Sequence, residues 1–272
     1  MKSNTTRFIP LVLFISVILA TLAACGGGGG SSPAPAPKPA PVVNADPTGY
    51  YDVNGTATVS GGAIVISDLE AMVHNNRLMM MSVANNLMYD IAITKISGND
   101  FTGTATVYTD GQNPMSNVPV TGTITTGSSI TGALTGTGAG NGTFSLTYAS
   151  SNDQPSKISR IVNTSPPWTG PIGNVGPTDN YQFGIDNTGM LYDFNPIGQG
   201  YFRGCSMDGT VTALSNTSLY RVVVTITQCN PVKDLDGDYT GLAATQDISD
   251  KVLSLTLTKA DGSYSVSGNF HH

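Results

Sequence analysis

The chain has 272 residues, including 32 Gly and 16 Pro, and only 11% of its residues are charged and 7% aromatic. It has few Glu, Lys and Ala but many Thr, Val, Ile and Gly, which argues against a mainly helical protein. The formal net charge of −6 argues against nucleic acid as a partner, because phosphate binding needs clustered Lys and Arg. The hydrophobic fraction of 39% is large enough for a folded core.

Residues 1–24 have the layout of a secretory signal. Lys2 and Arg7 precede an apolar stretch over residues 8–22 that is too short to span a bilayer comfortably. The segment ends in Leu22-Ala23-Ala24-Cys25, which resembles the bacterial lipobox. That resemblance implies cleavage before Cys25 and an acylated Cys25 that anchors the mature protein in a membrane. In enteric lipoproteins, an Asp directly after the lipidated Cys causes retention in the inner membrane. Gly26 occupies that position here, so the resemblance implies the outer membrane. The alternative is a plain secretory signal with an incidental Cys.

Residues 25–46 are predicted to be a tether. Residues 26–32 are Gly and Ser, a flexible composition, and residues 33–41 alternate Pro with Ala and one Lys. Such a Pro-rich stretch favours the polyproline conformation and reaches roughly 28 Å at ~3.1 Å per residue. The folded body should therefore hang from its anchor on a spacer with a loose base and a stiffer upper part.

A first β-lobe is predicted over residues 47–150. Apolar and polar residues alternate with period two, and Gly, Asn and Asp mark tight turns between the alternating runs. The predicted strands are 50–59, 63–74, 77–84, 87–96, 101–109, 118–125, 130–136 and 142–149. Short connections favour an antiparallel meander, which at eight strands can close into a small barrel. Residues 68–74 are also compatible with one or two helical turns.

A connector over 151–167 and a second β-lobe over 168–272 follow. Five short signatures of the first lobe recur in order, which favours an internal repeat over two segments that merely share a composition. The matching segments are 48–49 with 169–170, 103–106 with 209–212, 123–125 with 225–227, 132–136 with 237–241, and 144–147 with 253–256. The predicted fold class is all-β, with two tandem antiparallel lobes that are each a roughly eight-stranded meander or small barrel.

The chain resembles a group of uncharacterised proteobacterial lipoproteins with a lipobox, a Gly run, a Pro/Ala tether and two Gly/Thr-rich β-lobes. The stretches that carry the resemblance are 73–77, 128–132, 136–148 and 204–210. It implies a surface or periplasmic β-protein and no particular reaction. Paired-barrel surface lipoproteins that bind host proteins are a more distant likeness, of architecture alone.

Cys205 and Cys229 are predicted to form a disulfide. Both lie beyond the signal, in a compartment that favours oxidation, and residues 208–214 and 219–228 read as two strands around the turn at 215–218. A hairpin centred on residue 217 places the two cysteines opposite each other. No Cys-x-x-Cys pattern supports a redox or metal pair instead.

Two metal sites are weighed and disfavoured. Met72, Met79, Met80, Met81 and Met88 surround His74 and could suit copper, but successive strand residues alternate faces, so core filling is the better interpretation. The Asp234–Asp238 segment hints at calcium but lacks the Gly and the Glu of the loop motif, so a turn with exposed acids is preferred. His74 itself is interpreted as a polar turn residue rather than a catalytic one. No cofactor is predicted.

Aromatic residues crowd the first third of the second lobe, among Gly and Pro. Trp168, Tyr181 and Tyr201 are the candidate partner-binding residues, because aromatic side chains on loops form hot spots and carbohydrate platforms. The competing interpretation is that they fill the lobe's own core.

The residues favour a non-catalytic binding or structural module, displayed on the periplasmic or the cell-surface face of the outer membrane. The membrane is reached through the lipid anchor, and another envelope protein or a glycan is the candidate partner. The alternative class is a periplasmic enzyme inhibitor, similar to lysozyme inhibitors, or a hydrolase that uses Asp residues. The chain has one internal His and one Glu, which leaves few side chains for general acid–base catalysis. This favours the non-catalytic module.

Overall fold

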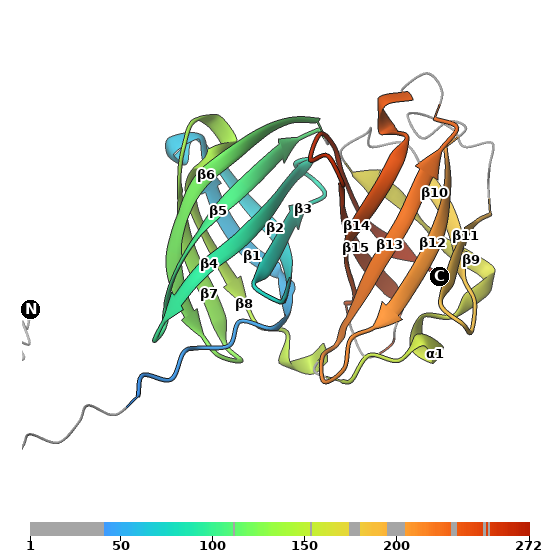
Figure 1. Ribbon diagram of the computed structural model, residues 1–272, viewed down its shortest axis with the longest axis horizontal. Coiled ribbons are helices and arrows are strands. Elements are labelled where there is room, and N and C mark those ends of the chain that lie inside the picture. Colours follow the sequence, from blue (N-terminus) through green and yellow to red (C-terminus); the bar gives the residue numbers. More distant parts are fainter. Residues whose placement is uncertain are drawn as a thin grey trace, which may run out of the picture. The chain divides into compact units, whose positions relative to one another are not determined.

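The computed structural model describes residues 41–110, 112–152, 154–173, 180–194, 205–229, 233–246, 249 and 251–272. Its strands form two closed antiparallel barrels of eight strands each, one after the other along the chain (Figure 1). The predicted fold class is thereby confirmed, and each lobe is a closed barrel rather than an open meander. Cys25, the signal and most of the tether lie outside the described residues. No helix in the described ranges combines the length and the apolar character needed to cross a membrane.

The first barrel is an up-and-down meander. Its strands are β1 (Gly49–Val59), β2 (Ile64–His74), β3 (Arg77–Ser82), β4 (Leu87–Ser97), β5 (Asp100–Thr109), β6 (Gln112–Thr125), β7 (Ser129–Thr135) and β8 (Asn141–Thr147). Short 3-10 turns lie at η1 (Ser60–Gly62), η2 (Gly138–Gly140) and η3 (Ser150–Asn152). Residues 68–74 belong to β2 and not to a helix, because Leu69, Ala71 and Val73 alternate into the core. Strand β6 begins six residues before its predicted start.

The second barrel repeats this topology. Its strands are β9 (Asn163–Gly173), β10 (Asn180–Ile185), β11 (Met190–Asp193), β12 (Ser206–Ala213), β13 (Leu219–Thr227), β14 (Gly237–Thr245), β15 (Val252–Lys259) and β16 (Ser265–His271). The short helix α1 (Ile158–Ile161) precedes β9, and η4 (Lys233–Leu235) precedes β14. Because β9 begins at Asn163, the second barrel starts within the stretch predicted as a connector.

Local chemistry explains how these sheets turn and close. The β2–β3 hairpin turns through Asn75 and Asn76 alone, whose φ values are 50° and 61°, as a two-residue primed turn requires. The first barrel closes where Val59 of β1 pairs with Gly142 of β8. A Cβ atom at Gly142 would lie 1.8 Å from the carbonyl oxygen of Thr58, so this approach needs a glycine.

Inward-facing side chains fill both barrels. An eight-stranded barrel has an interior just wide enough for this. The first core includes Tyr51, Leu69, Leu78, Tyr89, Phe101, Val120, Ile130, Phe144 and Leu146. The second core includes Trp168, Phe183, Leu191, Val222, Tyr239, Leu255 and Phe270. Most of the described core residues in both barrels are aliphatic or aromatic, and Met80, Met207 and the two cysteines complete them.

Four of the five recurring signatures do not fall on equivalent strands. Residues 48–49 and 169–170 lie at the first strand of each barrel, as a repeat requires. The other four matches pair β5 with β12, β6 with β13, β7 with β14 and β8 with β15, so each is displaced by one strand. The shared topology is therefore not traced by these four sequence matches, which reflect the Thr/Gly composition of barrel strands.

The end of the predicted tether is bound to the first barrel. The Ala45 N–H donates to the carbonyl oxygen of Gly98 at 2.8 Å, and the Asp46 N–H donates to Thr126 Oγ1 at 2.9 Å. Asn44 Oδ1 accepts from the Gly98 N–H at 3.0 Å. Residues 44–46, which were predicted to belong to the tether, are thus hydrogen-bonded to the first barrel.

Candidate functional site

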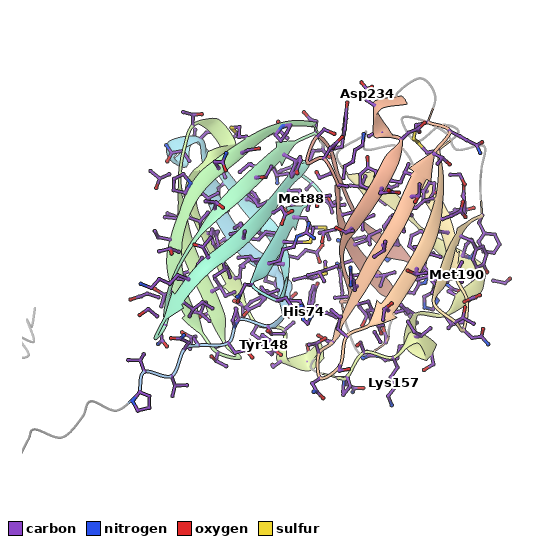
Figure 2. All side chains as sticks on the ribbon, in the orientation of Figure 1. His74, Met88, Tyr148, Lys157, Met190 and Asp234 are labelled. Carbon is purple, nitrogen blue, oxygen red and sulfur yellow. A yellow bond between two sulfur atoms is a disulfide. The ribbon has the colours of Figure 1, made fainter. Side chains whose placement is uncertain are left out.

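A third hydrophobic cluster joins the outer faces of the two barrels. Tyr50, Met72, Met79, Met88 and Tyr108 come from the first barrel, and Leu219, Leu242 and Ala244 from the second. Figure 2 shows the side chains of this region, with Met88 and His74 labelled. The Tyr108 hydroxyl also donates to the carbonyl oxygen of Gly262 at 3.1 Å. The barrels therefore share a buried contact in addition to the chain that connects them.

The methionines divide between two roles. Met80 points into the first core, whereas its neighbour Met79 faces the second barrel, as strand alternation predicts. Met72 pairs directly with Met79 across β2 and β3, so these two and Met88 lie on the same outer face. The prediction of core filling is thus right for Met80, while three of the others fill the contact between the barrels.

Glu70, the only glutamate of the chain, is buried in this contact with 1% of its surface exposed. Its Oε2 atom accepts hydrogen bonds from the Tyr50 hydroxyl at 2.8 Å, the Ser254 hydroxyl at 2.8 Å and Gln246 Nε2 at 3.2 Å. Burial raises the pKa of the Glu70 carboxyl, and the hydrogen bonds from Ser254, Tyr50 and Gln246 partly oppose that effect. Because Ser254 and Gln246 belong to the second barrel, this carboxyl links the two.

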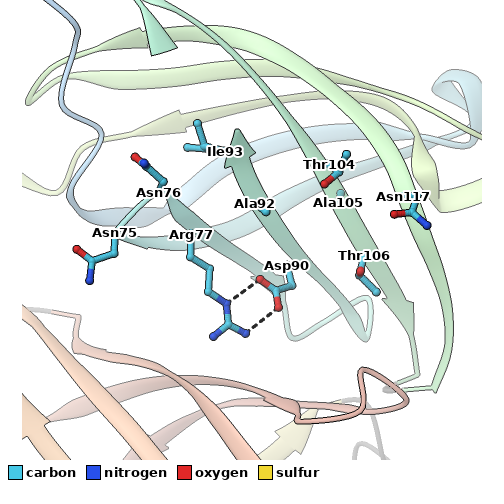
Figure 3. Close-up of a pocket in the computed structure, with 10 residues that line it drawn as sticks. All are labelled: Asn75, Asn76, Arg77, Asp90, Ala92, Ile93, Thr104, Ala105, Thr106 and Asn117. Atoms are coloured by element: carbon cyan, nitrogen blue, oxygen red, sulfur yellow. Dashed lines mark hydrogen bonds and ion pairs between the residues drawn. The ribbon is translucent and has the colours of Figure 1, made fainter. Parts of the chain in front are cut away.

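Arg77 forms a second polar link. Its Nε and Nη2 atoms donate to the two carboxylate oxygens of Asp90 at 2.8 and 2.7 Å (Figure 3). Nη2 also contacts the Thr258 hydroxyl of β15, which in turn donates to Asp90 Oδ2 at 3.3 Å. The guanidinium is therefore fixed in a fork-to-fork geometry. Its Nη1 atom makes no hydrogen bond with the described residues.

Two hollows lie on either side of Arg77. The larger, of about 420 Å³, is lined by Asn75, Asn76, Arg77, Asp90, Ala92, Ile93, Thr104, Ala105, Thr106 and Asn117 (Figure 3). The smaller, of about 290 Å³, is lined by His74, Asn75, Arg77, Leu214, Arg221, Thr240, Gly241 and Leu242. The smaller hollow, called the junction cleft below, draws residues from both barrels.

The structure contains a disulfide between Cys205 and Cys229, whose Cα atoms are 4.1 Å apart. The hairpin register pairs Ser206 with Thr227, so a regular ladder would place Gln228 opposite Cys205. Gln228 instead adopts a φ of 63°, and this left-handed residue brings Cys229 into position. Both cysteines are buried at the edge of the second core.

The aromatic candidates belong to the core and not to a binding surface. Trp168 on β9 and Tyr181 on β10 are buried, and Trp168 Nε1 donates to the carbonyl oxygen of Ile161 at 3.0 Å. Both side chains point into the second core, which agrees with the competing interpretation that these aromatic residues fill the core of their own lobe. Tyr201 lies outside the described residues.

Sequence reasoning missed the aromatic pair that does face outward. Tyr192 and Phe194 lie with ring centroids 5.3 Å apart, and Phe194 is 40% exposed. Both rings cover Gly184, which has no side chain to displace them. The alternation of residues 190–194, with Leu191 inward, is the signal that could have found the pair.

The remaining candidates are a histidine at a strand end and two aspartates that accept hydrogen bonds. His74 ends β2 next to the turn, as its neighbours predicted. In the acidic segment, Asp236 Oδ1 accepts from the Cys229 N–H at 2.9 Å and Asp238 Oδ1 accepts from the Thr225 hydroxyl at 2.7 Å. Among the residues that the structure describes, no three His, Cys, Asp or Glu side chains come together in a way that could hold a metal ion.

No known family model matches the chain, and no curated protein matches its sequence. Among solved structures it is similar to transferrin-binding protein B, isotype 1, from serogroup B Neisseria meningitidis, at 9% identity and a TM-score of 0.28 over 76% of this chain and 59% of that one. Two variants of transferrin-binding protein B from Haemophilus parasuis match at 8% identity and a TM-score of 0.27, over 80% of this chain and 62% of theirs. The chain thus spans about 60% of the length of these structures. Similarity this low carries no function to this chain, and the strand pairing alone establishes its fold.

Proposed function

We propose that this protein is an outer-membrane lipoprotein, anchored through Cys25, whose paired barrels form a non-catalytic binding module. Residues 1–24 serve as the signal, and the tether that follows carries the barrels away from the membrane. The partner is another envelope protein or a glycan.

The location of the hollows carries this proposal. Both barrel interiors are occupied by side chains, whereas the two hollows around Arg77 open on the outer surface, and one of them is shared by the barrels. A surface built in this way suits recognition of a partner from outside, because pockets between packed elements are common ligand sites. The buried contact around Glu70 and Met79 holds the two halves of that surface together.

The anchor is tested by metabolic labelling with a clickable fatty acid. The wild-type protein should be labelled and should fractionate with outer membranes, and Cys25→Ala should lose both properties. Labelling that persists in Cys25→Ala would refute the anchor.

The binding role is tested by site-specific photo-crosslinking in intact cells. A crosslinking residue in place of Asn117, which lines the larger hollow, should capture a discrete species, whereas one at the exposed Ser145 of β8 should not. Equal capture from both sites would contradict a localised surface. A hydrolase activity that disappears in a single Asp variant, with the fold intact, would favour the enzyme class.

A further inference from the structure

We propose that the junction cleft binds an oxyanion, a carboxylate or phosphate group on a small ligand, through Arg221 and the free edge of Arg77. This assignment deepens the proposed function and rests on it for the binding role. The ligand group sits between the β2–β3 turn of the first barrel and strands β13 and β14 of the second.

The charge of the cleft is opposite to that of the molecule. The chain has 18 acidic residues against 12 Lys and Arg, yet the described residues that line this hollow include two arginines and a histidine and no carboxylate. Asp90 pairs with Arg77 from beside the cleft, so that guanidinium is neutralised as a charge but keeps its donors at Nη1. Arg221 supplies the uncompensated positive charge, because it makes no ion pair or hydrogen bond with the described residues.

One of the two arginines is held in place before a ligand arrives. Asp90 and Thr258 fix the Arg77 guanidinium, which directly follows the two-residue turn at Asn75 and Asn76. Arg221 stands on the outer face of β13, where its backbone pairs with that of Leu242, another lining residue. A planar guanidinium offers two parallel donors to a carboxylate or phosphate, and pre-arranged donors lose less entropy on binding.

His74 provides a second, independent sign of a ligand. It pairs with Arg77 across the hairpin and lines the cleft, and its Nδ1 atom is buried without a hydrogen-bond partner. Buried polar atoms are normally paired, so an orphan of this kind calls for an explanation. Because this atom is closed to solvent in the free cleft, an oxyanion pairs with it only if the imidazole turns toward the ligand.

The test is titration calorimetry on the purified lipoprotein in neutral detergent at low ionic strength. Inorganic phosphate and acetate are the two probes, so that the arms separate phosphate from carboxylate ligands. We expect saturable one-site binding of at least one probe, weakened tenfold or more by Arg221→Gln and also weakened by added NaCl. The matched control is Lys157→Gln, which removes one exposed charge outside the cleft.

His74→Gln should weaken binding by a smaller factor, and Arg221→Lys should retain part of it, because the charge remains while the fork is lost. Binding that is absent for both probes, unchanged in Arg221→Gln, or reduced equally by Lys157→Gln would overturn the assignment. Crosslinking from Asn117 does not depend on Arg221. A failure here is therefore distinguishable from a failure of the proposed function.

Discussion

Glu70 shows how one side chain can couple the barrels to pH. The folded protein raises the pKa of this carboxyl through burial, so it holds the proton more tightly than the unfolded chain does. The stabilising contribution of the protonated group is complete below the unfolded pKa and is lost as the pH rises through the folded pKa. The contact between the barrels should therefore weaken from the acid range toward neutrality.

Glu70→Gln should remove that dependence. The amide stays neutral and polar, so the variant should gain thermal stability relative to the wild type as the pH rises, and thermal melts across the acid and neutral range measure this. Asp186→Asn is the control, because the pKa of Asp186 is shifted in the opposite direction to that of Glu70. Hydrogen bonds from Thr188 and Met190 lower the pKa of Asp186, so its stabilising effect is lost as the pH falls. Parallel pH profiles for wild type and Glu70→Gln would contradict the prediction.

Two aromatic residues, the buried Trp168 and the partly exposed Phe194, can be compared to test the assignment of the core. Trp168 is fully buried, so Trp168→Ala should lower the free energy of unfolding by about 3–5 kcal/mol. Phe194→Ala removes a ring that is 40% exposed and should cost far less. Urea denaturation followed by circular dichroism gives both values, and similar losses would argue against the described burial.

At the scale of elements, the disulfide holds the β12–β13 hairpin at its open end. Replacing both Cys205 and Cys229 with Ser frees a loop with a sequence separation of 24 residues. The expected loss is roughly 3 kcal/mol, mostly from the greater freedom of the unfolded chain. Non-reducing peptide mapping should find the bridge in the wild type, and two alkylatable thiols in the native protein would refute it.

The β1–β8 pairing is the closing step of the first barrel, and Gly142 is its tightest point. Gly142→Ala should destabilise the barrel by about 2–3 kcal/mol, because the new Cβ meets the Thr58 carbonyl oxygen. Ser145→Ala, on the same strand at an exposed position, should be nearly neutral. Hydrogen exchange should locate the loss in β1 and β8, and equal effects of the two variants would count against closure at this site.

At the scale of the whole molecule, the contact between the barrels decides whether they act as one body. A protease site inserted at residues 150–154 should give two fragments that are both β-rich but stay together in size-exclusion chromatography. Met79→Lys should separate them, because it places an unpaired charge in the contact. Val65→Lys, at an exposed site on β2, is the control. If the halves of the cleaved wild-type protein separate without any substitution, the contact does not hold them together.

Much of the fold could be predicted because strand alternation is a local signal. Seven of the eight strand starts predicted for the first barrel lie within one residue of those observed, since Gly, Asn and Asp mark the turns directly. The exception is β6, whose first residues around Pro114 and Asn117 lack alternation and pair with β5 through two irregular register shifts. Local pattern cannot detect a strand that is held mainly by its neighbour.

The candidate site between the barrels was harder to predict from the sequence, because it depends on which face of a strand meets the other barrel. Alternation puts Met79 and Met80 on opposite faces, but it does not say that the outer face is also buried. The same limit applies to Trp168 and Tyr181, whose inward positions follow from the barrel register and not from residue type.

By itself, the sequence determined the all-β class, the turns, and the pairing of Cys205 with Cys229, because each depends on residues close together along the chain. Only the tertiary structure decided that the two barrels share a core around Met79, that Glu70 is buried between them, and that His74, Arg77 and Arg221 line one cleft. Arg77 and Arg221 are 144 positions apart in the chain, and no local period relates them. Their meeting depends on how two closed barrels pack, which is set by the complementarity of their outer faces.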